Sequence, residues 1–338
     1  METIQPSPNY KRIATEEAWA PTELLDRWRT LLESNSLDDP GFTKLWGNFF
    51  SSDADFASQL MERLEDLGDR RIADMDAVGI DRQLLLLTAP GVQVFDKEEG
   101  AALAIASNDI VAAACGKHPD RFSALAAVAP QDPQAAAKEI DRAVNQLGLN
   151  GVVINSHTHG EYLDEAKFWP IFEAAEAIGA AIYIHPQTPP KKLIGSFLKY
   201  NLDTPMMGFA VEVALHTLKL ILTGVFDRFP KLKIVIGHAG EGLPFWLYRL
   251  DYWQGEANLK RKISEYMRDN IYVTTSGMAW EPAILFTQQV LGADRVLYAM
   301  DYPYQYGHEE VITTDNLAIS DQDKRKLYQT NAEAVFSL

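Results

Sequence analysis

The sequence contains a single cysteine, Cys115, among its 338 residues, so no disulfide can form within the chain. Cys115 lies in an alanine-rich helical run, which favours a small buried apolar residue over a nucleophile. Long apolar segments are missing too, and no run is long enough to span a bilayer. Residues 1–10 are polar and lack the pattern of a secretory signal. These absences predict a cytoplasmic protein with no membrane partner.

Basic residues are scarce. The chain has 31 Lys and Arg against 47 Asp and Glu, a formal net charge of −16. This balance disfavours nucleic acids and anionic membranes as partners, although the local charge of a site can still suit a small anionic substrate. A glycine-rich phosphate loop after the first strand and an internal repeat are also missing. The remaining composition, 47% hydrophobic and 23% charged, is that of an ordinary globular protein.

Short apolar runs alternate with helical patterns along the whole chain. The runs predict eight strands, at residues 11–15, 83–87, 122–128, 151–154, 181–185, 231–237, 270–275 and 295–300. Eight βα units favour the α/β class and a (β/α)8 TIM barrel, with an open doubly wound sheet as the alternative. We expect one domain over residues 1–338, with a helical and loop insertion at 21–70 after the first strand.

Helices are expected between these strands. The predicted segments are 21–33, 62–78, 97–117, a helix opening at Asp132 and Pro133, 168–178, 210–223, 241–251, 281–291 and 321–336. Within the insertion, residues 34–44 are expected to be a turn-rich loop, and Trp46, Phe49 and Phe50 to form an aromatic cluster.

Four of the predicted strands end on residues that bind metals or transfer protons. These residues are Glu16, His185, His238 and Asp301. In a barrel the functional side chains sit at the carboxyl ends of the strands, so we expect the four to meet at one site. A single histidine at a strand end is more often structural, and the repeated pattern is what favours a function.

Two carboxylates and one imidazole, from Glu16, His185 and Asp301, form a ligand set that Mn²⁺ or Zn²⁺ accepts, with positions left open for substrate. A buried ion pair is the structural alternative for Glu16. Glu241 follows His238 by three residues and can reach back to orient its ring and favour the imidazolium. The alternative for Glu241 is an ordinary acidic residue in the first turn of a helix.

Several short motifs around these residues resemble a known superfamily. They are Thr15-Glu16-Glu17-Ala18, Tyr183-Ile184-His185-Pro186, Gly237-His238-Ala239-Gly240-Glu241, Thr274-Thr275-Ser276-Gly277 and Ala299-Met300-Asp301-Tyr302-Pro303. Together they resemble the amidohydrolase superfamily, and within it the metal-dependent, non-oxidative aromatic acid decarboxylases. The stretches 71–76, 129–133 and 246–251 look most like the 5-carboxyvanillate decarboxylases. The resemblance covers nearly the whole chain.

The resemblance implies a barrel enzyme with Mn²⁺ or Zn²⁺, usually a homodimer or homotetramer. By position, Glu16, His185 and Asp301 match the metal ligands of the family, and His238 matches its catalytic histidine. Many members carry a His-x-His pair on the first strand, but this chain has Ala18 at the second position. The fourth strand also offers no lysine to bridge two metals. Both features predict one divalent ion.

The implied reaction is decarboxylation of an ortho-hydroxylated aromatic acid, either 5-carboxyvanillate or a related hydroxybenzoate. Direct loss of CO2 would leave an unstabilised aryl carbanion, so the ring carbon must be protonated first. An ortho hydroxyl, ionised at the metal, supplies electron density to that carbon, and the metal acts as template and Lewis acid. We expect Asp301 to donate the proton, supported by His238 and Glu241. Cleavage of the C–C bond then restores aromaticity.

The predicted substrate contacts lie at the same end of the barrel. They are Arg249, Thr88, Phe56, Phe209, Tyr302, Trp280, His157 and His159. Arg249 suits a carboxylate held by two hydrogen bonds, or it is an exposed helix arginine. The aromatic residues line an aromatic pocket or belong to the core, and the two histidines contact substrate or solvent.

Phe56 stands where similar 5-carboxyvanillate decarboxylases tend to carry an arginine, which keeps a mono-acid such as a dihydroxybenzoate or salicylate open as substrate. Two other functions compete with decarboxylation. One is hydrolysis of an ester, amide or lactone with Asp301 as general base. The other is a non-catalytic barrel that binds an aromatic ligand.

Overall fold

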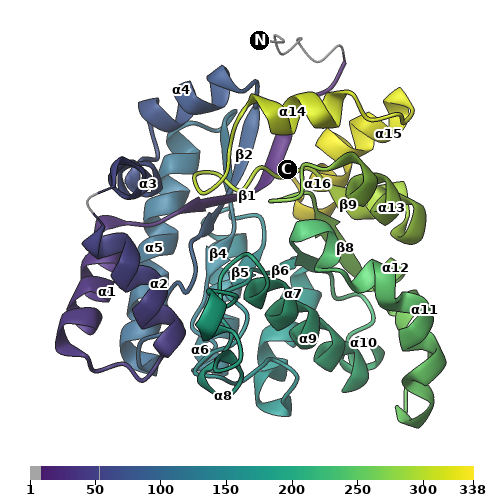
Figure 1. Cartoon of the computed structure of the whole chain (residues 1–338), viewed down its shortest axis with the longest axis horizontal. Coiled ribbons are helices and arrows are strands. Elements are labelled where there is room, and N and C mark those ends of the chain that lie inside the picture. The colour runs from purple at the N-terminus through teal and green to yellow at the C-terminus, as the bar shows by residue number, and fades with distance from the viewer. Residues whose placement is uncertain (1–8, 53) are drawn as a thin grey trace.

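The protein is described by a computed structural model that covers residues 9–52 and 54–338, in which helices surround a ring of short parallel strands (Figure 1). The strands are buried on both faces, which explains why they are continuous apolar runs in the sequence. Their bounds are β1 Ile13–Trp19, β2 Arg82–Leu87, β3 Phe122–Ala124, β4 Ala126–Ala127, β5 Val152–Ile154, β6 Ile182–Ile184, β7 Ile234–Ile236, β8 Ile271–Thr274 and β9 Val296–Leu297.

Each strand pairs in parallel with the next along the chain, from β1 to β3 and from β4 to β9. The predicted third strand is interrupted at Leu125, whose N–H donates to Leu85 O (2.8 Å), and the chain then passes to the β5 side. At the other edge, Thr15 N donates to Tyr298 O (3.0 Å). These bonds connect the two sheets at both ends, and the predicted (β/α)8 barrel is confirmed.

Strand β1 is longer than predicted, because it continues through Trp19 instead of stopping at residue 15. Its register against β2 shifts between Ala14 and Glu17. Glu16 and Glu17 therefore lie inside the strand. Successive strand residues point to opposite faces, so these two adjacent carboxylates are directed into different surroundings.

The insertion after β1 contains the helices α1 Thr22–Ser34, α2 Pro40–Ser51, α3 Asp55–Glu65 and α4 Asp69–Ala77. The predicted aromatic cluster is present: the Trp46 ring lies 5.5 Å from both Phe49 and Phe50. The single helix predicted over 62–78 is wrong. Asp66 breaks it, because its carboxylate accepts the backbone N–H groups of Gly68 (3.0 Å) and Arg71 (2.9 Å). The predicted loop at 34–44 is shorter than expected, since Asp39 caps α2.

The remaining helices lie between or after the strands. They are α5 Lys97–Lys117, α6 Pro133–Asn145, α7 Trp169–Ile178, α8 Lys191–Ile194, α9 Gly208–Leu222, α10 Val225–Arg228, α11 Leu243–Trp253, α12 Ile263–Asn270, α13 Glu281–Leu291, α14 His308–Asp315, α15 Asp321–Arg325 and α16 Asn331–Phe336. The cap predicted at Asp132 is confirmed, since its carboxylate accepts the N–H of Ala135 (3.1 Å). Helices α8, α10, α12 and α14 were not predicted. No helix in the described ranges is long and apolar enough to cross a membrane.

Candidate metal centre

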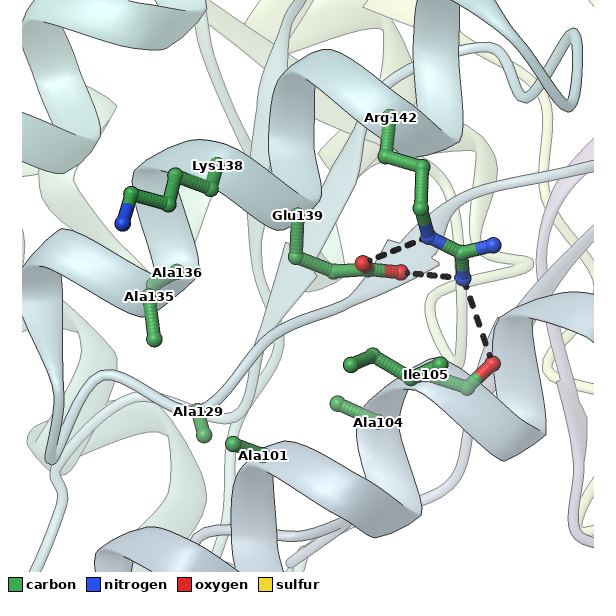
Figure 2. Close-up of a pocket in the computed structure, with 9 residues that line it drawn as sticks. All are labelled: Ala101, Ala104, Ile105, Ala129, Ala135, Ala136, Lys138, Glu139 and Arg142. Atoms are coloured by element: carbon green, nitrogen blue, oxygen red, sulfur yellow. Dashed lines mark hydrogen bonds and ion pairs between the residues drawn. The ribbon is translucent and has the colours of Figure 1, made fainter.

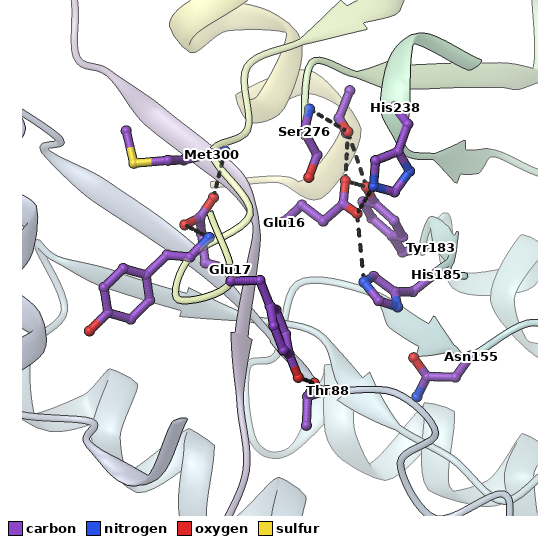
Figure 3. A network of polar contacts seen from close by, with 12 residues as sticks. Glu16, Glu17, Thr88, Asn155, Tyr183, His185, His238, Ser276 and Met300 are labelled. Atoms are coloured by element: carbon purple, nitrogen blue, oxygen red, sulfur yellow. Dashed lines mark hydrogen bonds and ion pairs between the residues drawn. The ribbon is translucent and has the colours of Figure 1, made fainter. Parts of the chain in front are cut away.

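Three of the residues predicted from strand ends come together at one end of the barrel. Ligand atoms of Glu16, His185 and Asp301 all lie within 4.8 Å of one another. His238, which follows β7, joins them: its Nε2 lies 3.6 Å from Glu16 Oε1, the same distance as the Nε2 of His185. Figure 3 shows both imidazoles converging on the Glu16 carboxylate. The four side chains thus form one site.

The Glu16 carboxylate has one oxygen held in place and one without a donor. Thr274 Oγ1 (2.7 Å) and the hydroxyl of Tyr183 donate to Oε2. Oε1 is buried and has no hydrogen-bond partner among the described residues. Gly237 makes room for this carboxylate, because a Cβ there would lie 3.0 Å from both oxygens. A buried, unpaired, fixed acceptor is a donor atom suited to a cation.

The charge states of the other two candidate ligands also suit a cation. Burial lowers the pKa of His185 to about 4, which leaves the neutral imidazole that coordinates metals. Burial and the charge of Glu16 raise the pKa of Asp301 well above its usual range, although His238 lowers it. The two carboxylates repel each other here unless a proton or a cation lies between them. Two oxygen donors and one nitrogen donor fit Mn²⁺ or Zn²⁺.

His238 is fixed by the residue three positions later. Its Nδ1 lies 2.7 Å from Glu241 Oε1, so the expected reach-back of Glu241 is present. The helix predicted to begin at Glu241 begins instead at Leu243, because Ala239, Gly240, Glu241 and Gly242 all have positive φ. Burial lowers the pKa of His238, but the charges of Glu241 and Glu16 raise it to about 10, which favours the imidazolium.

Two of the predicted substrate contacts are buried, and their polar atoms already have hydrogen-bond partners within the protein. The Thr88 hydroxyl lies 2.5 Å from that of Tyr304, and Tyr304 is close enough to Asp301 for that charge to raise its pKa, after the larger effect of burial. His157 uses both ring nitrogens: Nδ1 accepts from Gly160 N (3.2 Å) and Nε2 donates to Thr188 O (3.1 Å). His157 therefore holds the loop after β5 in place, whereas its neighbour His159 is exposed.

Other predicted contacts are not brought to the centre within one chain. The Tyr302 hydroxyl donates to Asp74 (2.9 Å), and its ring faces Arg71 (4.6 Å) on the side of the insertion. Arg249 is exposed on α11 against the Trp246 ring (5.5 Å). Three aromatic residues are exposed or half-buried: Phe56 (57%), Trp280 (63%) and Phe209. Their roles in substrate binding stay predictions.

Two residues that shape the site were not among the predicted site residues. Tyr183 belongs to an apolar run that predicts core, yet its hydroxyl donates to Glu16. Its position two residues before His185 was a usable signal, because residues i and i+2 of a strand share a face. Asn155, the residue directly after β5, is the second. Figure 3 shows it near His185, and its Oδ1 is buried without a partner among the described residues.

A comparison with known proteins decides the family. The sequence profile described as amidohydrolase matches residues 37–338. The chain belongs to the amidohydrolase family. This member is 49% identical to a 5-carboxyvanillate decarboxylase of Novosphingobium aromaticivorans, crystallised with manganese and 4-hydroxy-3-methoxy-5-nitrobenzoic acid (TM-score 0.95; 98% of this chain, 97% of that chain). The family resemblance predicted from the motifs is confirmed.

Two further relatives cover the amidohydrolase chain almost completely. The crystal structure of the 5-carboxyvanillate decarboxylase of Sphingomonas paucimobilis is 41% identical, with a TM-score of 0.93, over 98% of this chain and 100% of that chain. A gamma-resorcylate decarboxylase of Polaromonas sp. is 34% identical over 97% of this chain and 98% of the relative.

Proposed function

We propose that this amidohydrolase is a non-oxidative decarboxylase of an ortho-hydroxylated aromatic carboxylic acid, with 5-carboxyvanillate as the first candidate. One observation carries the proposal: Glu16, His185, Asp301 and His238 converge in a chain 49% identical to a 5-carboxyvanillate decarboxylase that binds manganese. The gamma-resorcylate decarboxylase among its relatives supports the same reaction class.

Glu16, His185 and Asp301 would hold one divalent ion, Mn²⁺ or Zn²⁺. When bound, the ion supplies positive charge that favours the ionised ortho hydroxyl and orients the substrate. Oε1 of Glu16 and the neutral ring of His185 are the preformed donors. In the described part of the chain, this is the one cluster of three such ligands, which agrees with the prediction of a single ion.

Asp301 would carry the proton of the reaction. Burial and the charge of Glu16 raise the pKa of Asp301 well above its usual range, which suits a carboxyl that donates a proton. Asp301 donates this proton to the ring carbon that bears the carboxylate. The electrons of the C–CO2 bond then return to the ring, CO2 leaves, and a solvent proton restores the carboxyl. The positive charge of His238, held by Glu241, would stabilise the substrate carboxylate and orient it.

The test is CO2 release by Mn²⁺-reconstituted protein from a panel of ortho-hydroxybenzoates that includes 5-carboxyvanillate, with a chelated sample as control. Chelator-sensitive release from one compound supports the proposal. Release from mono-acids but not from 5-carboxyvanillate would tie the selectivity to Phe56. No release from any compound, combined with turnover of an ester, amide or lactone, would replace the decarboxylase with a hydrolase.

We also propose that the protein is a homodimer or homotetramer that assembles through the outer face of α11. Five aromatic side chains on this helix are exposed, by 45–85%: Phe245, Trp246, Tyr248, Tyr252 and Trp253. Phe245 extends the patch toward Phe286 on α13 (6.3 Å). Aromatic side chains carry ~150–250 Å² each, so together they approach the ~800 Å² that one partner buries in a standard interface.

A second copy is the occupant that the size of this patch favours, because a typical monomer exposes apolar patches of only ~300–600 Å². Light scattering after size exclusion should show a smaller species for the Tyr248→Glu/Trp253→Glu variant than for the unmodified protein. An unchanged mass would place the interface elsewhere.

A further inference from the structure

A second buried glutamate lies directly beside the metal ligand Glu16, on the other side of the strand. Figure 3 shows Glu16 and Glu17 directed to opposite sides of β1. Glu17 is 0% exposed. Its Oε1 accepts the amide N–H of Met300 (3.0 Å) and its Oε2 accepts that of Tyr302 (3.2 Å). These two residues flank Asp301, so the Glu17 carboxylate holds the backbone on both sides of a metal ligand.

The turn at Asp301 needs such support. Asp301 has φ +73°, in the left-handed region that residues other than glycine rarely adopt. A backbone in this region persists only where its surroundings hold it. A third bond to β1 helps, since Ala18 N donates to Tyr302 O (2.7 Å). The two bonds from Glu17 are the ones made by a side chain, so a substitution can remove them without breaking the strand.

Glu17 is itself held by a chain of polar contacts. Gln83 Nε2 donates to Glu17 Oε2 (3.3 Å), and Gln83 Oε1 accepts from Arg71 Nη1 (3.2 Å). Arg71 is 0% exposed and donates to the carbonyl oxygens of Ala18 (2.8 Å) and Asp66 (2.7 Å). Its positive charge partly offsets the cost of burying the Glu17 carboxyl. The contacts lead from α4, through Gln83, to the turn that carries Asp301.

We propose that Glu17 is a positioning residue, which sets the place of Asp301 as metal ligand and proton donor by accepting the amides of Met300 and Tyr302. It acts through the backbone and contacts neither substrate nor metal. The proposal rests on the metal centre and on the role of Asp301 given above. Partners of metal ligands that act in this indirect way typically change metal affinity or activity ~10–100-fold when they are replaced.

The decisive variant is Glu17→Gln. Its amide keeps the shape of the side chain but turns an NH2 donor toward one of the two N–H donors, so one of the two bonds is lost. We expect the Mn²⁺ dissociation constant, measured by EPR titration, to rise ~10-fold or more. With a working substrate, kcat should fall while KM changes little. Because the EPR titration needs no substrate, a failure of the decarboxylase assay is distinguishable from a failure of this proposal.

A matched control is Glu139→Gln on α6. Glu139 is another buried glutamate, paired with Arg142 (2.8 Å) and Asn108 (2.7 Å), and it lines a groove of about 300 Å³ between α5 and α6 in the outer helix layer (Figure 2). Its replacement should lower the melting temperature and leave the Mn²⁺ dissociation constant unchanged. An equal rise in both variants would reduce Glu17 to a general stabilising residue and overturn the proposal.

Glu17→Asp provides a second variant in case Glu17→Gln does not fold. It keeps the charge and both acceptor oxygens but is shorter by one methylene, so the two bonds should weaken instead of one being lost. We expect a smaller rise in the Mn²⁺ dissociation constant than for Glu17→Gln. If the variants that fold bind Mn²⁺ with unchanged affinity, Asp301 does not depend on Glu17 and the proposal is wrong.

Discussion

Two buried glutamates of this chain, Glu139 and Glu16, lie in opposite electrostatic surroundings. Both oxygens of Glu139 are engaged by Arg142 at 2.8 Å, and Oε1 also accepts from Asn108 (2.7 Å). Glu16 is ion-paired with neither an arginine nor a lysine among the described residues, and its Oε1 has no hydrogen-bond donor there. Its neighbours include a second carboxylate, that of Asp301.

This difference indicates a structural role for the charge of Glu139 and a functional role for that of Glu16. A buried carboxylate with its partners in place has its desolvation cost largely offset, and removing one partner costs ~3–5 kcal/mol. An unpaired buried acceptor costs ~1–3 kcal/mol, so it calls for an explanation such as a bound ion or a catalytic role. The groove beside Glu139 is lined mainly by alanine and aliphatic atoms, with few convergent polar groups. A hollow alone therefore does not mark the site, whereas the unpaired oxygen of Glu16 beside His185, His238 and Asp301 does.

The largest expected effect comes from Asp301→Asn. The amide cannot donate an acidic proton and coordinates a cation more weakly, so CO2 release should fall at least ~10³-fold, of the order that positioned acid–base groups contribute. The assay is CO2 release at saturating Mn²⁺, with Glu139→Gln as control, which should stay within ~2-fold of the unmodified enzyme. Turnover by Asp301→Asn at the rate of the control would mean that another group protonates the ring.

The barrel and the four converging residues could be predicted because strand ends in a parallel barrel meet by topology alone. The apolar runs gave the strand order, and each polar residue after a run marked the same rim. The direction in which each side chain on the rim points could not be predicted. Tyr302 turns outward to Asp74, whereas Tyr304, two residues later, reaches Thr88.

Two further features could not be predicted from the local sequence, because they depend on contacts formed in the folded chain. The helix predicted over 62–78 is broken by hydrogen bonds to Asp66, a residue type that is favoured both at helix N-caps and in turns. The sequence predicts no role for Glu17, because its partners Met300 and Tyr302 lie almost the whole length of the chain away. Periodicity reports which face of an element is buried, not which distant groups meet it.

A smaller effect is expected from Glu241→Gln. The bond of 2.7 Å between Glu241 and His238 Nδ1 fixes the ring so that Nε2 is directed to Glu16. An amide at position 241 keeps the volume but removes the charge that favours the imidazolium. We expect kcat to fall ~10–100-fold with little change in KM or in the melting temperature. A fall in kcat of less than 2-fold would show that Glu241 is an ordinary acidic residue of the turn.

Glu212 on α9 extends the contrast between paired and unpaired carboxylates to a third case. It is 0% exposed, and neither oxygen is in good hydrogen-bond geometry with a donor of the described chain. Burial raises its pKa to about 8. The nearby hydroxyls of Ser156 and Tyr162 lower the pKa, and the charge of Glu241 raises it. Unlike Glu139, Glu212 is ion-paired with no arginine or lysine among the described residues, and its raised pKa favours the neutral, protonated carboxyl.

The proton on Glu212 makes the unfolding free energy depend on pH. The unfolded chain releases it near pH 4.5 and the folded chain near pH 8, so the stabilisation is complete below pH 4.5 and is lost progressively as the pH rises to 8. Glu212→Gln has no proton to lose. Its unfolding free energy relative to the unmodified protein should therefore improve between pH 5 and pH 8, by up to a few kcal/mol. Urea unfolding across this range measures the difference, and Glu139→Gln gives the cost of losing a paired carboxylate. Parallel curves for Glu212→Gln and the unmodified protein would mean that the pKa of Glu212 does not change on folding and that burial does not keep it protonated.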